Sequence, residues 1–388
     1  MNKFSDIVKS FSELRYIANA LNFYSPLGRS KMLNQEFLTE AALIEEELHK
    51  TKNVLSFISN QQHKKNVSGI KEILHQVQDI SGSLRNLQAG MTLDDIEFFE
   101  IKKFALLITE LRETLQGYDI ITLSDTEAAI KILDPENKRI PRFFIYDEYD
   151  ENLIPLRKKL MQYGLSSEEK ETLELNILVI EDRIREKLSA SLVTCHKNLE
   201  QSFEAVAELD YLIAKADFFI CKKLSRPMVS NTSTKFTGLF NIEVQEILQK
   251  KGKVFQPVDI IIEASPCIIT GANMGGKTVL LKSAALAQYL FQFGFYVPAT
   301  AAEIVPVKKV MCSFENFSNI KSGLSSFATE IVTINDIIHH SKNKENILVL
   351  IDEPAQTTNP EEGVAIVSAI AEILSENKTR SLITTHYN

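Results

Sequence analysis

Residues 269–278 read ITGANMGGKT and place three glycines, a lysine and a threonine directly after an apolar run. From Gly271 to Thr278 the spacing satisfies G-x-x-x-x-G-K-[ST], which is typical of a loop that holds the phosphates of a nucleoside triphosphate. Glycines leave the backbone N–H groups free to surround the phosphates, and the following helix adds its positive N-terminus. Lys277 would then neutralise β- and γ-phosphate oxygens, and Thr278 would be a ligand of Mg²⁺. The alternative is a glycine-rich turn without a ligand.

Two apolar runs later in the chain end in residues that suit the same chemistry. Residues 347–351 (ILVLI) are continuously apolar, as in a strand buried on both faces, and the run ends in Asp352 and Glu353. An aspartate at a strand tip can hold Mg²⁺ through water, and the adjacent glutamate can polarise the attacking water. A further strand-like run, LITT, ends at His386, which could sense the γ-phosphate through a hydrogen bond. The alternative for the two acids is that they merely end a strand.

The elements that must position these residues alternate between strand-like and helical patterns. Short β-rich runs occur at 260–262, 267–269, 347–351 and 382–383, and helical patterns occur at 277–291, 325–341 and 361–376. Strands that alternate with helices predict a mostly parallel sheet. A breaker-rich linker at 226–238 separates this part from the residues before it.

The first part of the chain reads as helices followed by a connector. Residues 1–130 have helical patterns, with Ser25 as the N-cap and Pro26 as the first position of one helix. Residues 131–150 contain prolines and mixed charge, and we expect short strands at the stretch RFFIY within them.

One apolar stripe of helical spacing runs from Leu173 to Leu212, after a predicted capping box of Ser166 and Glu169. No proline or glycine interrupts residues 165–226, which favours a single long arm or spine. The alternative is two shorter helices with an unmarked joint.

The composition limits the class of protein. The chain has 388 residues, 44% of them apolar and 24% charged, as in a soluble globular protein of two or three domains. The formal charge of −8 argues against a protein that coats nucleic acid indiscriminately, although it is compatible with a local basic strip. We expect no membrane span and a cytoplasmic location. Four scattered cysteines predict reduced, mostly buried thiols: Cys195, Cys221, Cys267 and Cys312.

Five motifs in one order resemble the ATPase domain of the MutS family, within the ABC superfamily. They are TGANMGGKT at 270–278, GFYVPATAAEI at 294–304, SGLSSFATEI at 322–331, LVLIDEP around Asp352 and TTHY around His386. Weaker similarity to the family extends over almost all of the preceding chain. The resemblance implies a multidomain α and α/β fold, with an all-helical core and long lever helices before a P-loop ATPase domain. The implied boundaries are 1–130 for the core, 131–225 for the levers and 226–388 for the ATPase domain.

The resemblance also implies roles for single residues. Glu353, Lys277 and His386 would act in the hydrolysis of ATP. Thr278 and Asp352 would hold Mg²⁺. The nucleotide-binding residues would be Gly271, Asn273, Met274, Gly275, Gly276, Lys277, Thr278 and Val279.

Two serines of the third motif imply a partner subunit. In the family this stretch reaches the nucleotide of the partner, so Ser325 and Ser326 would contact a γ-phosphate across a dimer. The resemblance therefore implies a homodimer or a paralogous heterodimer through the ATPase domain.

Departures from the family pattern shape the expected function. The helical core begins almost at residue 1 and the lever hairpin turns at about 164–167, so we expect a short member without the mismatch-reading and clamp domains. The loop at 354–363 (PAQTTNPEEG) replaces a Gly-Arg-Gly-Thr-Ser-Thr-like run, and the chain stops two residues after His386, as if truncated. We expect weak dimerisation and impaired hydrolysis from this piece.

Three functions compete, and the sequence does not choose between the first two. The first is a DNA-directed ATPase of repair or recombination type. The second is ATP-driven remodelling of a client enzyme, such as a cobalamin-dependent aminomutase. The third, a nucleotide-gated scaffold, is disfavoured because Glu353 is present. Candidates for DNA contact are Lys138, Arg139, Arg142, Arg157, Lys158 and Lys159, although the neighbouring acids Asp147, Glu148, Asp150 and Glu151 equally indicate a solvated mixed-charge face.

Overall fold

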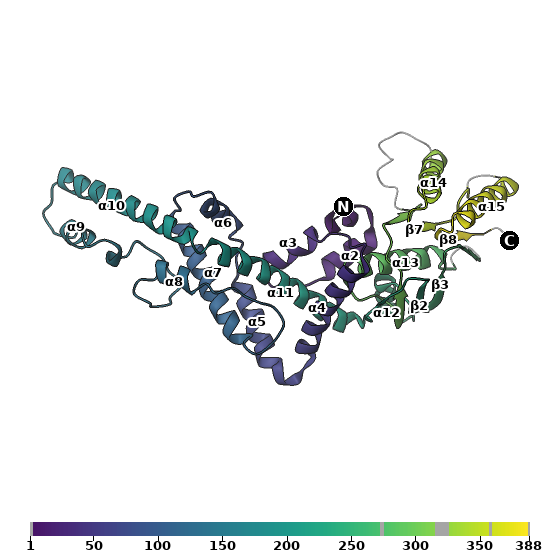
Figure 1. Ribbon diagram of the computed structural model, residues 1–388, viewed down its shortest axis with the longest axis horizontal. Coiled ribbons are helices and arrows are strands. Elements are labelled where there is room, and N and C mark those ends of the chain that lie inside the picture. Colours follow the sequence, from purple (N-terminus) through teal and green to yellow (C-terminus); the bar gives the residue numbers. More distant parts are fainter. Residues whose placement is uncertain (1–2, 272–274, 315–325, 357–358, 387–388) are drawn as a thin grey trace. The chain divides into compact units, whose positions relative to one another are not determined.

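The computed structural model describes residues 3–271, 275–314, 326–356 and 359–386. The chain forms two compact units, whose elements are labelled in Figure 1. The first, which we call the sheet unit, comprises Met1–Asn22, Met32–Leu55 and Ala214–Asn388. The second, which we call the helical unit, comprises Phe23–Lys31 and Ser56–Ile213.

Helices form the described secondary structure of the helical unit. They are α3 (Pro26–Asn34), α5 (Lys64–Gln76), α6 (Ser81–Gln88), α7 (Asp95–Thr114), α8 (Glu127–Leu133), α9 (Leu153–Leu160), α10 (Ser167–Val193) and α11 (His196–Lys222), with 3₁₀ turns at Gln61–His63 and Asp147–Tyr149. The last residues of α3 and α11 belong to the sheet unit. α7 packs against α5, α6 and α8, and α10 packs against α6, α8 and α9. The stripe of Phe98, Ile101, Ala105 and Ile108 on α7 is fully buried, as the helical period requires.

The long arm predicted from the uninterrupted stripe is wrong, because a joint at Thr194 and Cys195 separates α10 from α11. The Thr194 hydroxyl donates to the carbonyl of Ser191 at 2.7 Å, and the Cys195 N–H donates to Leu192 at 2.8 Å. These bonds to the third residue back tighten the last turn and end the α-helical pattern without glycine or proline. The predicted start of α10 is confirmed, since Ser166 and Glu169 form the capping box.

The short strands expected at RFFIY are also absent from the described structure, where residues 142–146 are irregular. Some side chains of this segment pack against the helices instead of pairing with a neighbouring strand, whereas Phe144 is 53% exposed. The ring centroid of Phe143 lies 5.0 Å from that of Phe98 on α7, and Ile145 and Tyr146 are buried.

A buried carboxylate caps the N-terminus of α3. Asp210 accepts hydrogen bonds from the backbone N–H groups of Tyr24 (2.9 Å) and Ser25 (2.8 Å), and from the Ser25 hydroxyl (2.6 Å). Burial raises the pKa of Asp210, although these hydrogen bonds favour the carboxylate. α3 begins at Pro26 as predicted, but a side chain distant in sequence satisfies its first donors.

The close approach of Asp210 to α3 gives a stability prediction. A Cβ at Gly28 would lie 2.5 Å from the Oδ2 atom of Asp210, so Gly28→Ala must displace the carboxylate. We expect the free energy of unfolding to fall by roughly 1–3 kcal/mol, measured by urea denaturation. The matched control is Gly82→Ala on α6, because a Cβ there meets nothing within 4 Å. Equal stability of the Gly28 variant and the wild type would contradict the packing.

The sheet unit combines strands and helices. Its helices are α1 (Phe4–Ser10), α2 (Ser12–Ala20), α4 (Ala41–Ser59), α12 (Ile242–Lys250), α13 (Lys277–Gln292), α14 (Ser326–Lys342) and α15 (Pro360–Glu376). Its strands are β1 (Met228–Val229), β2 (Thr234–Leu239), β3 (Val258–Ile262), β4 (Pro266–Thr270), β5 (Ala301–Ile304), β6 (Lys309–Cys312), β7 (Ile347–Ile351) and β8 (Arg380–Thr385).

These strands form two sheets, where the sequence predicted one mostly parallel sheet. One sheet has the order β4-β8-β7-β6 with every pair parallel, as predicted. The other has the order β1-β5-β2-β3, in which β2 runs antiparallel to β3 and β5. The segment interpreted as a linker therefore contains β1 and most of β2. The strand was interpreted as a linker because it contains Gly238, a residue type that usually interrupts strands. In the structure Gly238 lies at a register shift between Phe236 and Leu239.

The parallel sheet is covered on both faces, which explains the continuous apolar run of β7. Ile347, Val349 and Ile351 join a buried cluster with residues of α14 and α15. The alternate residues Leu348 and Leu350 are also buried and point to the opposite face, and α13 also packs against β7 (Figure 1). Since all four strands are parallel, their carboxyl ends meet at one edge of the sheet.

Burial of the cysteines is less uniform than predicted. Cys195 and Cys312 are buried, Cys267 is half-buried and Cys221 is exposed, and none of the four forms a disulfide. None of the described helices is both long and apolar enough to cross a membrane.

Candidate nucleotide site

The predicted strand–loop–helix arrangement is present at the edge of the parallel sheet. β4 ends at Thr270, and α13 begins at Lys277 with Gly276 as its N-cap residue. Gly276 has φ +85°, a left-handed conformation that glycine adopts without a steric penalty. Gly275 lies before it and Val279 lies in the first turn of α13, whereas Asn273 and Met274 fall outside the described residues.

The Lys277 ammonium group lies between the glycine-rich loop and the acidic end of β7. It donates to the carbonyl of Gly271 at 2.6 Å and forms an ion pair with the Oε1 atom of Glu353 at 3.0 Å. Only 7% of Lys277 is exposed. The side chain thus brings a cation to the loop. This cation contacts the Glu353 carboxylate, and a phosphate could take the place of that carboxylate.

Thr278 meets Asp352 at the same edge. The Thr278 hydroxyl donates to the Oδ2 atom of Asp352 at 2.7 Å, and the backbone N–H of Asp352 donates to Ser313 at 2.9 Å. A hydroxyl and a carboxylate are hard oxygen donors of the kind that hold Mg²⁺ together with water and substrate phosphates. Within the described ranges, no group of three histidine, cysteine or acidic residues could hold a metal ion.

Thr384 is a site residue that the sequence analysis missed. It lies on β8, the strand between β4 and β7, and is fully buried. Its hydroxyl donates to the Oδ1 atom of Asp352 at 2.6 Å and accepts from the backbone N–H of Glu353 at 3.0 Å. One hydroxyl therefore orients both acidic residues. The sequence did contain a sign of this role, because Thr384 lies directly before Thr385 and His386. In the strand register Ile351 pairs with Ile383, so Thr384 lies beside the residues that follow β7.

The Glu353 carboxylate is shared by three side chains. Besides Lys277, its Oε2 atom accepts from the Gln356 amide at 2.9 Å and lies 3.8 Å from the Nδ1 atom of His386. Glu353 has φ +43° and Ala355 has φ +62°, which is uncommon for residues with a Cβ and typical of strained functional sites. The strained turn thus contains the residue whose carboxylate meets Lys277.

The turn after β7 is held by a second residue that the sequence analysis missed. Glu330 of α14 accepts from the backbone N–H of Ala355 at 2.8 Å. Ser326 is the first residue of α14, and Ser325 lies outside the described residues. Their contact with a partner's nucleotide stays a prediction.

Three of the six basic residues suggested for DNA contact form ion pairs with acids. Arg157 binds Asp147 at 2.5 Å and Glu181 at 2.8 Å. Lys138 binds Glu136 at 2.7 Å, and Arg139 binds Glu127. These contacts favour the mixed-charge interpretation for this segment.

Comparison with known proteins gives one family. The family model described as MutS domain V matches residues 267–388, which contain Lys277, Asp352, Glu353 and His386. The chain belongs to the MutS family. All side chains that meet at the edge of the parallel sheet, including Thr384, therefore fall within the matched segment of this MutS-family chain.

Curated relatives of the MutS-family chain match more of its length. An "Endonuclease MutS2" of Caldicellulosiruptor saccharolyticus is 34% identical over 227 residues, which are 58% of this chain and 27% of that protein. A "DNA mismatch repair protein MutS" of Caldanaerobacter subterraneus is 26% identical over 333 residues, 85% of this chain and 36% of that protein. A "DNA mismatch repair protein Msh6" of Gallus gallus is 31% identical over 269 residues, 62% of this chain and 19% of that protein. The chain thus spans well under half of the length of these relatives.

Proposed function

We propose that this MutS-family chain binds Mg²⁺–ATP at residues 271–278 and hydrolyses it to ADP and phosphate. The observation that carries the proposal is the meeting of Lys277 and Thr278 with Glu353 and Asp352 at one edge of a parallel sheet. A cation, a hydroxyl and two carboxylates with these partners supply the groups that phosphoryl transfer needs, namely charge neutralisation, metal ligands and a base.

The ion pair between Lys277 and Glu353 suggests how the residues respond to a nucleotide. Phosphate oxygens would take Lys277 from Glu353, because an ammonium group binds a polyphosphate more strongly than a single carboxylate. Glu353 would then be free to orient and polarise a water molecule, while Thr278 and Asp352 hold the metal. Mg²⁺ in this position would neutralise charge that develops on the phosphate oxygens. His386, close to Glu353, would report the state of the γ-phosphate.

We further propose that hydrolysis requires a second subunit and is directed to DNA. Ser325 and Ser326 would complete the site of a partner, as a homodimer or a paralogous heterodimer. The relatives are named for mismatch repair or as an endonuclease, which favours DNA over a client enzyme. α11 contributes residues to both units, so it could transmit changes from the site. The lever movement and the domain boundaries stay part of this proposal.

Phosphate release from ATP tests the function, measured with the purified chain alone and with homoduplex, mismatched or branched DNA. We expect magnesium-dependent release that one of these DNAs stimulates. Release without any effect of DNA would overturn the DNA-directed part, and the absence of nucleotide binding would overturn the whole proposal.

Thr384 gives a prediction for the metal site. Thr384→Val removes the hydroxyl that orients Asp352, so the Mg²⁺ concentration for half-maximal ATP binding should rise by roughly tenfold. Thr384→Ser keeps the hydroxyl and should restore the wild-type value. The measurement is a titration of Mg²⁺ with a fluorescent ATP analogue. If the valine variant has the same Mg²⁺ dependence as the serine variant, Thr384 does not position the site.

A further inference from the structure

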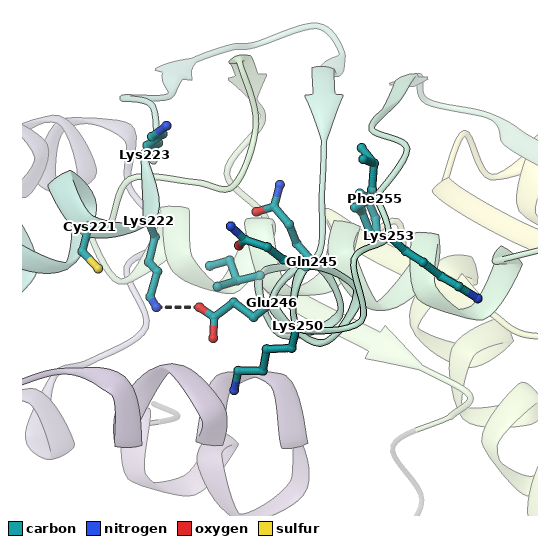
Figure 2. Close-up of a pocket in the computed structure, with 11 residues that line it drawn as sticks. Cys221, Lys222, Lys223, Gln245, Glu246, Lys250, Lys253 and Phe255 are labelled. Carbon is teal, nitrogen blue, oxygen red and sulfur yellow. Dashed lines mark hydrogen bonds and ion pairs between the residues drawn. The ribbon is translucent and has the colours of Figure 1, made fainter.

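A basic pocket of about 740 Å³ lies in the sheet unit, among residues that the nucleotide site does not use (Figure 2). The last residues of α11 and one side of α12 line it. Its charged and amide residues are Lys222, Lys223, Lys250, Lys253, Glu246, Gln245 and Gln249. Four lysines against one glutamate is a strong local excess in a chain whose formal charge is −8.

Helix ends fix the positions of these lysines. Lys223 has φ +54° and follows α11, where the N–H of Leu224 returns to the carbonyl of Phe219 at 3.1 Å. α12 ends in the same way at Gly252, and the N–H of Lys253 returns to the carbonyl of Leu248 at 2.9 Å. Both are left-handed helix caps with hydrogen bonds across six residues, so the backbone at the pocket is ordered.

The single glutamate of the pocket does not cancel this charge. Glu246 binds the Lys222 ammonium group at 2.5 Å, a pair drawn in Figure 2, and accepts from the Tyr16 hydroxyl at 2.5 Å. Burial alone would raise the pKa of Glu246, but the hydrogen bonds from Lys222 and Tyr16 outweigh it and lower the pKa. Glu246 is therefore a carboxylate that takes up the charge of Lys222.

The remaining three ammonium groups face solvent. Lys223, Lys250 and Lys253 are exposed. None of them makes an ion pair within the described residues, although the charge of Lys250 also helps to lower the pKa of Glu246. Lysine at a helix C-terminus usually serves only to balance the helix dipole, which is equivalent to about −0.5 charge per helix end. Two helix ends offset about one of these lysines, so a net charge of roughly +2 remains for a ligand.

We propose that this pocket binds the phosphate backbone of a nucleic acid through Lys223, Lys250 and Lys253. Lysines on flexible stems act as point charges for phosphates and need no fixed base pattern, and Gln245 and Gln249 add neutral donors. The pocket is open, and its cations belong to two helix ends, which suits successive phosphates of a strand. The inference rests on the proposed direction of the protein to DNA, but not on ATP hydrolysis.

Fluorescence anisotropy with a short labelled homoduplex tests the inference on the full chain. The test variant is Lys223→Glu/Lys250→Glu/Lys253→Glu. The control is Lys64→Glu/Lys65→Glu/Lys170→Glu, which changes the net charge equally at exposed lysines of the helical unit. We expect the test variant to lose about tenfold or more in affinity, and its salt dependence to fall by roughly 0.9 in log–log slope per lost phosphate contact. The control should bind like the wild type.

Two controls keep the outcomes distinct. Both variants should bind a fluorescent ATP analogue like the wild type, so a failure of the nucleotide site would be seen separately. The milder Lys→Gln version of the test variant should show the same loss of slope, which excludes misfolding caused by charge reversal. Wild-type affinity and slope in the test variant would overturn the proposal. Binding of inorganic pyrophosphate, measured with the same variant, shows whether the pocket takes only small anions: loss of that binding with DNA binding unchanged would also overturn it.

Discussion

Lys277→Ala is expected to reduce ATP affinity by at least about 10²-fold. Lys277 brings its ammonium group to the glycine-rich loop, where it already binds the Gly271 carbonyl at 2.6 Å. Each hydrogen bond to a charged phosphate oxygen contributes about 1.5–3 kcal/mol, so the loss of two contacts accounts for this factor. Isothermal titration with Mg²⁺–ATP measures the effect.

Lys282→Ala is the matched control for this variant. Lys282 lies on the same helix, α13, and binds Glu13 at 2.8 Å. Its removal deletes a cation of the same helix without touching the loop, so ATP affinity should stay within about twofold of the wild type, a change of a few tenths of a kcal/mol. If both variants bind ATP equally well, Lys277 is not a phosphate ligand.

Glu353→Gln is expected to separate binding from hydrolysis. The amide cannot accept a proton from water, so single-turnover phosphate release should slow by about 10²–10⁴-fold. ATP binding should persist or tighten. The Glu353 carboxylate lies 3.0 Å from the Lys277 ammonium group and competes with phosphate for it, and the variant lacks this carboxylate. Quenched-flow assays of phosphate release, together with an ATP-binding titration, measure the two effects.

An exposed glutamate of the next helix provides the control for Glu353. Glu361 lies in the first turn of α15 and has no contact with Lys277. Glu361→Gln should leave the rate of phosphate release and the ATP affinity unchanged. Normal turnover in the Glu353 variant would remove that residue from the catalytic role.

Much of the nucleotide site could be predicted because its signals are local in sequence. The spacing from Gly271 to Thr278 encodes a turn that requires glycine, and it indicated the start of α13 to within a residue. The apolar run before Asp352 indicated a strand covered on both faces, and all five residues of β7 are buried. Parallel strand ends then bring these two segments together.

The remaining features depend on contacts that local patterns do not encode. Thr384 acts through two hydrogen bonds across the sheet, and Glu330 through one bond to a distant backbone N–H. The N-terminal segments join the sheet unit because Phe4 and Phe37 pack on Phe293, at ring distances of 4.9 and 5.6 Å. Such packing leaves no period or motif in the sequence.

The structure of the chain with Mn²⁺ and a non-hydrolysable ATP analogue tests the central claim most directly, because anomalous scattering locates the metal. We expect the metal between the Thr278 hydroxyl and the Asp352 carboxylate. The Lys277 ammonium group should then contact phosphate oxygens and no longer contact Glu353. A metal–nucleotide complex bound elsewhere, with the contact between Lys277 and Glu353 intact, would contradict the account.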